Sequence, residues 1–565
     1  MKISKYFKYA ALAVILIPGF SSCNDFFNKL PLNEIVLEKF YTEEADIRSV
    51  LTSCYATMQS TDCVRLMALW GELRSENLTD GGQLNEDISQ ILQENILQTS
   101  PYTKWASVYN VINLCNTVLY YAPIVQQRDP NFSESEMKEV SAQASAIRAL
   151  CYFSLIRTFR DVPLVTVASI DDTQRFTVPV TKFNDVLDFL ITDLEGVKNN
   201  AVNEFAKPLD NTSRFTRYGI YALLADLYLW KGTDEGYTKS IECCDNVINF
   251  KRTQYEEQLA AYGDGLDLVL YKEIPLISEL YSKGSTLSGN AFTQIFGVGN
   301  SFESIFELNY AQNRSSTNAL LSNYGTSQNI TGTLSATPFL VEFTFSGTNR
   351  YFKRTDCRYL ENFQLSTALY GISKYTTTSA SFTSQLATTT TESVPAKSRR
   401  SDAYANWIFY RLTDVVLIKA QAILELSRGK SSLVQNKAFE ESLKLVSAVY
   451  NRANNLLDVS ADTLKFADYS TFDARQDLIL LERQRELMFE GKRWFDLLRV
   501  ARRENSNDII IRNVLAKQKT SQAAIRVKLL SKDYIYFPYN ESELKANKQL
   551  VQNPAFILDK NIVLN

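Results

Sequence analysis

The chain has 565 residues, 22% of them charged, and a formal net charge of −3 at pH 7. This near-neutral balance gives no strong positive field, so we expect no nucleic-acid partner. The sequence contains no histidine, which excludes Ser-His-Asp and Cys-His nucleophilic sites, His-ligated zinc and imidazole acid–base catalysis. Carboxylate-only chemistry, such as glycoside hydrolysis, and plain binding both remain.

The amino terminus has the pattern of a secretion signal that ends in a lipid-attachment site. Three lysines precede an apolar stretch at residues 10–17, which is too short to span a bilayer. Gly19-Phe20-Ser21-Ser22-Cys23 follows and resembles a lipobox, although Phe20 stands where Leu, Val or Ile is more usual. We expect residues 1–22 to be removed and Cys23 to carry diacylglycerol, which would anchor the protein to a membrane. The alternative is an ordinary signal peptide with a chance cysteine.

Seven further cysteines follow, an odd number that cannot all pair within the chain. No two of them have CxxC spacing. Cys115 and Cys151 lie in apolar helical runs and are predicted to be buried. The pattern indicates neither a disulfide framework nor a metal site, and we expect no cofactor.

Apolar residues recur with helical spacing in several segments along the chain. The first is predicted to begin after Thr42 as its N-cap, and Gly232 is predicted to end the fourth. The segments form helix–turn–helix pairs similar to tetratricopeptide repeats, although no strict 34-residue period is present. The predicted helices cover residues 43–58, 102–121, 135–159, 215–231, 237–250, 404–426 and 438–453.

Residues 251–403 have a different composition, rich in Ser, Thr, Gly, Asn and Tyr. Short strand-like pieces such as residues 304–308 are embedded in them. We expect an irregular, loop-rich insertion, and loops held by a rigid scaffold often carry recognition.

Residues 482–499 contain glutamates at every fourth position, Glu482, Glu486 and Glu490. On one helix these three would share a face, and paired carboxylates suggest a glycosidase. Arg485 and Arg493 follow two of them by three residues, close enough to neutralise them. A carboxylate held ionised in this way is unfit as a general acid, so we favour a structural role. Their catalytic use is the alternative.

The same block carries an apolar stripe at Leu481, Met488 and Phe495, seven residues apart. This spacing predicts that the block packs inward. Trp494 is accordingly interpreted as a core residue rather than a platform for a sugar.

Blocks along nearly the whole chain resemble the SusD/RagB family, in the same order. Residues 482–499 are the most specific of them. Arg160 stands where the family usually has glycine, and Ala555-Phe556 replaces the more usual Gly-Tyr. The other matching blocks are residues 25–27, 40–45, 147–153, 159–164, 222–229, 303–308, 356–358, 537–538 and 552–554.

The resemblance implies a mostly α fold, a TPR-like scaffold of helical pairs with an irregular inserted subdomain containing short strands. It divides the mature chain into an amino-terminal helical region (23–250), the insertion (251–403) and a carboxyl-terminal region (404–565) that completes the scaffold.

The resemblance also implies a function. SusD-like proteins are lipoproteins on the outer face of the outer membrane, where they capture oligosaccharides and deliver them to a SusC-like TonB-dependent transporter. We therefore expect a binding protein and not an enzyme. The alternatives are a peptide-binding lid of the RagB kind, a scaffold that binds only protein, and a cell-surface glycosidase.

No motif fixes the ligand contacts, so position selects the candidates. One group lies in the loop-like residues 69–77, where an arginine has Glu72 as an alternative partner. The other consists of tyrosines in the insertion. The candidates are Trp70, Arg74, Asn77, Tyr324, Tyr351 and Tyr375.

Overall fold

The structure is a computed structural model of the whole chain. It describes residues 40–557 except 171–176, 264–266, 280–286, 289, 312–316, 319, 326–328, 330, 344–348, 354–355, 365–368, 383–395 and 455–463. The predicted signal peptide and Cys23 lie outside these residues. Within the described part, each helix is too short or too polar to span a membrane.

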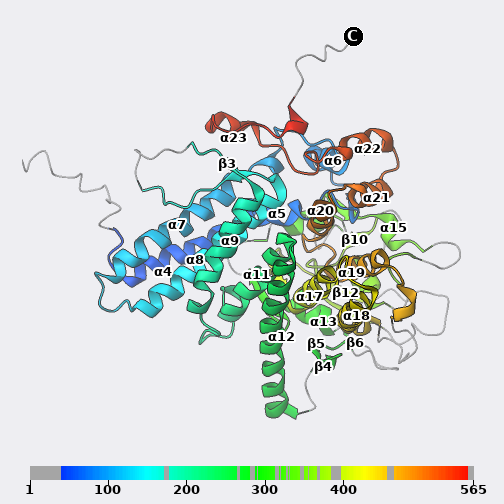
Figure 1. Cartoon of the computed structure of the whole chain (residues 1–565), viewed down its shortest axis with the longest axis horizontal. Coiled ribbons are helices and arrows are strands. Elements are labelled where there is room, and N and C mark those ends of the chain that lie inside the picture. The colour runs from blue at the N-terminus through cyan, green and yellow to red at the C-terminus, as the bar shows by residue number, and fades with distance from the viewer. Residues whose placement is uncertain are drawn as a thin grey trace, which may run out of the picture.

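The amino-terminal helices lie side by side in antiparallel pairs (Figure 1). Helix α7 (Ala106–Gln126) packs against both α4 (Glu44–Met58) and α8 (Glu134–Phe159). Helix α9 (Phe183–Val197) covers another side of α8, which is therefore buried along most of its length. Two shorter helices, α5 (Thr61–Trp70) and α6 (Glu86–Leu92), belong to the same region.

A second set of pairs continues the scaffold. Helix α11 (Arg217–Lys231) packs on α12 (Asp234–Tyr262), with Gly232 between them at φ +70° as predicted. Helix α17 (Leu412–Leu426) contacts α12, α18 (Ser432–Asn454) and α19 (Phe472–Leu487). The mostly helical, TPR-like fold is thus confirmed. Helix α12 continues without a break past residue 250, where the insertion was predicted to begin.

The other described elements are short, and most of them lie in the predicted insertion. Strand β7 (Ser304–Leu308) was predicted correctly and pairs antiparallel with β13 (Trp407–Arg411). The other pairs are β1 (Leu78–Asp80) with β8 (Leu334–Ala336), β2 (Val162–Pro163) with β3 (Val180–Thr181), β4 (Leu268–Tyr271) with β5 (Ile274–Ile277), β9 (Phe363–Gln364) with β10 (Gly371–Ile372), and β11 (Thr377–Phe382) with both β12 (Ala396–Arg399) and β6 (Leu287–Ser288). Short helices are α10 (Asp210–Ser213), α13 (Asn290–Phe292), α14 (Leu320–Tyr324), α15 (Pro338–Val341) and α16 (Cys357–Asn362).

The carboxyl-terminal helices close the fold: α20 (Arg493–Glu504), α21 (Asp508–Lys517), α22 (Gln522–Leu530) and α23 (Glu541–Ala546). The segment between α22 and α23 returns to the amino-terminal region. Phe537 N donates to Thr158 O (2.9 Å) at the end of α8. The Tyr539 hydroxyl donates to Asp161 O (2.7 Å). The carboxyl-terminal segment is therefore packed against the end of α8.

Two predicted helix starts are wrong. Helix α4 is capped by Glu43 rather than Thr42, because the Asp46 carboxylate accepts from the backbone N–H groups of both residues. Residues 404–411 are not helical: five of them form β13, which is buried throughout. A fully buried strand and a buried helical turn have the same apolar composition, so periodicity does not separate them.

The block at residues 482–499 forms two helices rather than one. Helix α19 ends at Leu487, and α20 begins at Arg493. Phe489 and Gly491 between them have φ values of +66° and +70°. Glu490 therefore lies in the turn and not on the helix face of Glu482 and Glu486. The block does pack inward, as predicted.

Arg160 occupies the position where the family pattern has glycine, and it keeps a glycine-like backbone. Its φ is +70° at the end of α8. A non-glycine residue pays a steric cost in this region. The side chain forms ion pairs with Asp161 and Asp533, which offset part of that cost.

The seven cysteines beyond Cys23 are buried free thiols. Cys115 and Cys151 lie in the helical core, as predicted.

Candidate functional site

The predicted contacts after α5 lie in the protein interior. Every side chain from Glu72 to Asn77 has 0% exposed surface, as does Trp70. The Trp70 indole donates to Tyr102 O (2.8 Å), and the Asn77 amide donates to Glu72 Oε1 (2.7 Å). In this structure Trp70 and Asn77 are core residues that a ligand does not reach.

Arg74 has the same character. Its guanidinium forms an ion pair with Glu94 (2.6 Å), not with the expected Glu72, and both partners are fully buried. It also stacks 4.3 Å from the ring centroid of Trp494. Trp494 is 1% exposed, which confirms its interpretation as a core residue. Arg74 thus joins distant segments of the core.

The three predicted tyrosines differ from one another. Tyr324 and Tyr375 are fully buried, and the Tyr324 hydroxyl donates to Phe489 O (3.0 Å). Tyr351 is 4% exposed but lines an open groove. A ligand can enter a groove but not the protein core, so Tyr351 lies beside a space that a ligand can occupy, and Tyr324 and Tyr375 do not.

The glutamates of the 482–499 block are buried and occupied. Glu486 contacts Arg358 (3.0 Å), Arg411 (2.7 Å) and Arg452. Burial alone would raise the pKa of Glu486, but Arg452, Arg411 and Arg358 hold it well below its usual value. Such a carboxylate stays ionised and cannot serve as a general acid.

Glu482 and Glu490 have their own partners. Glu482 pairs with Arg485 (3.0 Å), as predicted. Arg493 does not neutralise Glu490, because its guanidinium binds Glu76 (2.6 Å). Glu490 instead pairs with Arg411 and Lys374, both at 2.8 Å. Although burial opposes ionisation, these two cations keep the pKa of Glu490 below its usual value.

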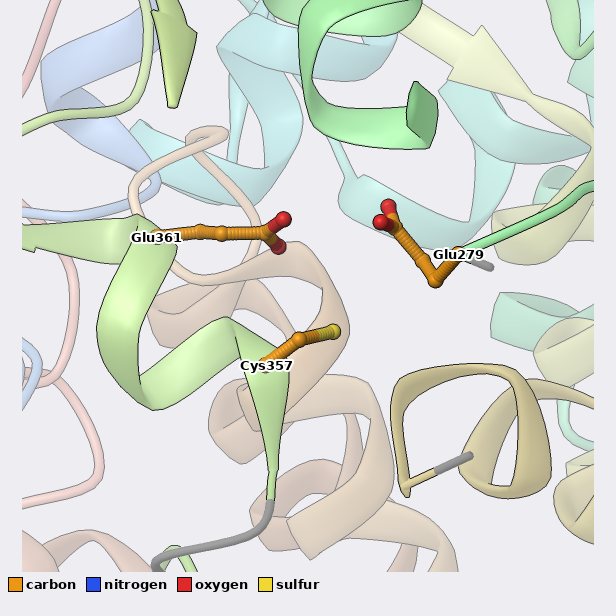
Figure 2. A group of neighbouring side chains, drawn as sticks. All are labelled: Glu279, Cys357 and Glu361. Carbon is orange, nitrogen blue, oxygen red and sulfur yellow. The ribbon is translucent and has the colours of Figure 1, made fainter. Parts of the chain in front are cut away.

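One group of side chains has the composition of a metal site. Figure 2 shows Glu279, Cys357 and Glu361 pointing toward one another, with ligand atoms within 4.8 Å. They line a small cavity of about 30 Å³ that Arg358 and Arg452 also line. Burial raises the pKa of the Cys357 thiol well above its usual value, which disfavours the thiolate that binds metals. Cationic walls and a protonated thiol argue against a bound metal ion.

The groove lined by Tyr351 is much larger than this cavity, with a volume of about 650 Å³. We call it the tyrosine groove. It lies between α19, α21, residues 350–353 and residues 464–469. Three tyrosines contribute to its wall: Tyr351, Tyr450 and Tyr469.

The position of Tyr351 is fixed by its backbone. Its N–H donates to Asn349 Oδ1 (2.7 Å), and its carbonyl accepts from Arg485 Nε. Its ring packs 5.5 Å from that of Phe339. Tyr351 is therefore a fixed part of the wall, with little of its own ring exposed.

Polar groups complete the tyrosine groove. Gln484 donates to Glu76 (3.1 Å) and Asn77 (2.8 Å) behind the wall, which ties the groove to the buried loop. Arg350, Lys353 and Lys465 are exposed beside the tyrosines. Flat rings next to hydrogen-bond donors can hold an amphipathic ligand such as a sugar.

A second groove, of about 660 Å³, lies between α12, α17, α18 and the β4–β5 hairpin. Its floor is aliphatic, with Ile248, Ile423 and Leu445. Exposed lysines such as Lys437 and Lys444 form its rim. Since none of the described residues that line it is aromatic, this groove suits a sugar less well.

Two family models match the chain. The model described as "SusD family" matches residues 338–556, and the one described as "Starch-binding associating with outer membrane" matches residues 25–229. Together they span more than half of the sequence. The chain belongs to the SusD family.

Curated relatives of this SusD-family protein are distant, and some of them extend over most of its length. A SusD-like protein from Formosa agariphila is 23% identical over 517 residues, which are 88% of this chain and 92% of that one. A SusD-like protein from Bacteroides ovatus is 25% identical over 306 residues, 50% of this chain and 53% of that one.

Solved structures show the same fold. A SusD superfamily protein from Bacteroides vulgatus superposes with a TM-score of 0.63 at 17% identity, covering 92% of this chain and all of that one. The protein NanU from B. fragilis superposes with a TM-score of 0.60 at 17% identity, covering 93% and 99%.

Sequence reasoning missed most of the groove of this SusD-family protein. Tyr450 and Tyr469 lie outside the predicted insertion, in the carboxyl-terminal region, where they read as helix-packing residues. Only the fold brings them to Tyr351. The run Arg350-Tyr351 beside a basic Lys353 was the available local signal.

Proposed function

We propose that the protein is a glycan-binding lipoprotein of the outer membrane, which captures oligosaccharides outside the cell and delivers them to a SusC-like TonB-dependent transporter. The observation that carries this proposal is the tyrosine groove on a SusD-family fold. The description of the amino-terminal family model, which names starch binding and outer-membrane association, supports it.

The groove can hold a sugar by two kinds of contact. The ring of Tyr469, which is partly exposed, can cover the apolar face of a pyranose, and the side chains of Arg350 and Lys465 can donate to its hydroxyl or acidic groups. An open groove that buries only part of the ligand gives moderate affinity, which suits a protein that must release its cargo.

Binding without turnover follows from the state of the carboxylates. Glu486 and Glu490 are buried and held ionised by arginine and lysine. Among the described residues of the tyrosine groove, Asp468 and Asp477 carry carboxylates, and Asp477 pairs with Arg512 (3.2 Å). Glu486 and Glu490, held ionised, are unfit as general acids.

Binding is tested with the purified mature protein against a panel of oligosaccharides and peptides, by affinity electrophoresis followed by calorimetry. We expect an oligosaccharide to bind and Tyr469→Ala to weaken its binding about tenfold, which corresponds to about 1.4 kcal/mol and lies within the range of about 0.5–1.5 kcal/mol for a stacked aromatic ring. Tyr262→Ala is the control, because Tyr262 is 74% exposed at the end of α12. Binding of peptides alone would identify a peptide-binding lid. Binding of neither class of ligand would favour the alternative of a scaffold that binds only protein.

Membrane attachment is tested separately. Labelling cells with a fatty-acid analogue should tag the wild-type protein and not Cys23→Ser. Protease added to intact cells should digest the tagged protein if it faces outward. Co-purification of a TonB-dependent transporter with the tagged protein tests the partner.

A further inference from the structure

The charges that line the tyrosine groove are unequal. Among the residues that the structure describes, its wall contains six cationic side chains, Arg350, Lys353, Lys465, Arg485, Arg493 and Arg512, against the two carboxylates of Asp468 and Asp477. The whole chain, in contrast, has a net charge of −3. The excess of positive charge in the groove is therefore opposite in sign to the net charge of the protein.

Three of the six cations are committed to internal partners. Arg485 pairs with Glu482 (3.0 Å) and Arg493 with Glu76 (2.6 Å), both behind the wall. Arg512 pairs with Asp477 (3.2 Å) at the rim. These pairs hold the wall in place and add little net charge to the groove.

Arg350 and Lys465 remain available. Both are exposed, and neither forms an ion pair with another residue that the structure describes. Exposed cations without acidic partners are common on surfaces, but here they stand at the same groove as three tyrosines.

The cations lie next to the rings. The Arg350 guanidinium is 5.7 Å from the ring centroid of Tyr351, and the Lys353 ammonium is 5.6 Å from that of Tyr450. Tyr351 and Tyr450 are themselves buried, so the partly exposed Tyr469 is the ring in this groove on which a sugar can stack. A substituent of a sugar bound there can reach a cation of the same groove. That cation can neutralise an anionic substituent, whereas a hydroxyl gains only a hydrogen bond.

We propose that the tyrosine groove selects anionic oligosaccharides, in which uronate carboxylates or sulfate esters pair with Arg350 and Lys465. This inference rests on the proposed function and narrows it to one chemical class of cargo. Carboxylate and sulfate share the negative charge that the groove recognises, and the experiment separates them.

The experiment compares matched ligands by calorimetry on the mature protein. The uronate arm uses oligogalacturonate and the same oligomer with its carboxylates methyl-esterified. The sulfate arm uses chondroitin sulfate oligosaccharides and their desulfated form. In at least one arm, the form with the full charge should bind about tenfold or more tightly than its matched form, and raising the salt concentration should reduce the difference.

A paired variant assigns the effect to the groove. Arg350→Gln/Lys465→Gln should remove the preference for the charged ligand, leaving a weaker affinity equal for both forms. The matched control, Lys437→Gln/Lys444→Gln, removes the same charge from the exposed rim of the second groove and should leave the preference unchanged.

The experiment distinguishes failure of the anionic preference, failure of its assignment to the tyrosine groove and failure of the proposed function. Equal binding of charged and matched forms, or binding of neutral oligosaccharides alone, overturns the anionic preference and leaves glycan capture standing. A preference lost equally in the control variant overturns the assignment to the tyrosine groove. Absence of binding to any oligosaccharide overturns the preference and the proposed function together.

Discussion

The backbones of Gly71 and Gly491 are in direct contact: a Cβ built on Gly71 would lie 1.8 Å from the Gly491 carbonyl oxygen. The N–H of Trp494 donates to Gly71 O (2.8 Å) at the same junction. The loop after α5 and the turn between α19 and α20 are thus joined at a point where no side chain fits.

Gly71→Ala should therefore destabilise the protein strongly. The added methyl group meets backbone atoms that cannot rotate away, so we expect a loss of about 3 kcal/mol in the free energy of unfolding. Gly196→Ala is the control, since Gly196 lies in α9 with open space around it. It should be neutral or stabilise by up to about 1 kcal/mol. Denaturant midpoints measure both, and equal stability of the two variants would refute the close contact.

Removing one member of the Arg74–Glu94 pair should be costly. Arg74→Met leaves the Glu94 carboxylate buried without its cation, which we expect to cost about 3–5 kcal/mol. Arg74→Met/Glu94→Gln removes both charges and should recover much of this loss. Glycan affinity of the folded double variant should equal that of the wild type, since neither side chain reaches the surface. A lost affinity in that variant would restore Arg74 as a ligand contact.

Glu307 should make stability depend on pH. Burial raises the pKa of Glu307 to about 7. In the unfolded chain this carboxyl ionises near its ordinary pKa of 4.5, so the folded state holds the extra proton between pH 4.5 and 7. The stability contributed by this group is complete below pH 4.5 and is lost as the pH rises through 7.

The test compares the wild type with Glu307→Gln by urea denaturation at pH 4.5 and pH 8. The variant should gain about 3 kcal/mol relative to the wild type between the two pH values, because each unit of pKa shift corresponds to about 1.4 kcal/mol. Glu441→Gln, at an exposed position, should follow the wild type. A variant that shows the same pH dependence as the wild type would place the titration elsewhere.

Substitutions at Arg160 should separate backbone strain from ion pairing. Both Arg160→Ala and Arg160→Gly lose the pairs with Asp161 and Asp533, but glycine also relieves the cost of φ +70°. Arg160→Gly should therefore be more stable than Arg160→Ala by about 1 kcal/mol. Thermal unfolding of the two variants measures the difference, and alanine equal to glycine would argue against strain at this turn.

Local patterns predicted the helices well because apolar spacing and caps are properties of neighbouring residues. Gly232 ended its helix as expected, and residues 135–159 differ from α8 by one residue at one end. The break inside 482–499 was missed, since Phe489 adopts its positive φ only because the turn packs against the loop after α5. Residue type alone gives no such signal.

The candidate site was harder to predict because it depends on contacts between distant segments. Trp70 and Arg74 lie in a segment, residues 69–77, that was predicted to be a loop, and they were therefore predicted to be accessible to a ligand. Their partners are Tyr102, Glu94 and Trp494, and no local rule pairs them. Tyr351, which lines the tyrosine groove, was among the predicted candidates, whereas Tyr450 and Tyr469 were not.

The contact between Phe537 and Thr158 has a consequence for how the chain reaches its native state. Ribosomes make α8 long before they make the strand of backbone that covers its end. Until that late segment arrives, the aromatic residues around Phe159 lack part of their cover, including the rings of Phe537 and Tyr539. This part of the core of a nascent chain is therefore completed only after nearly all of the sequence has been made.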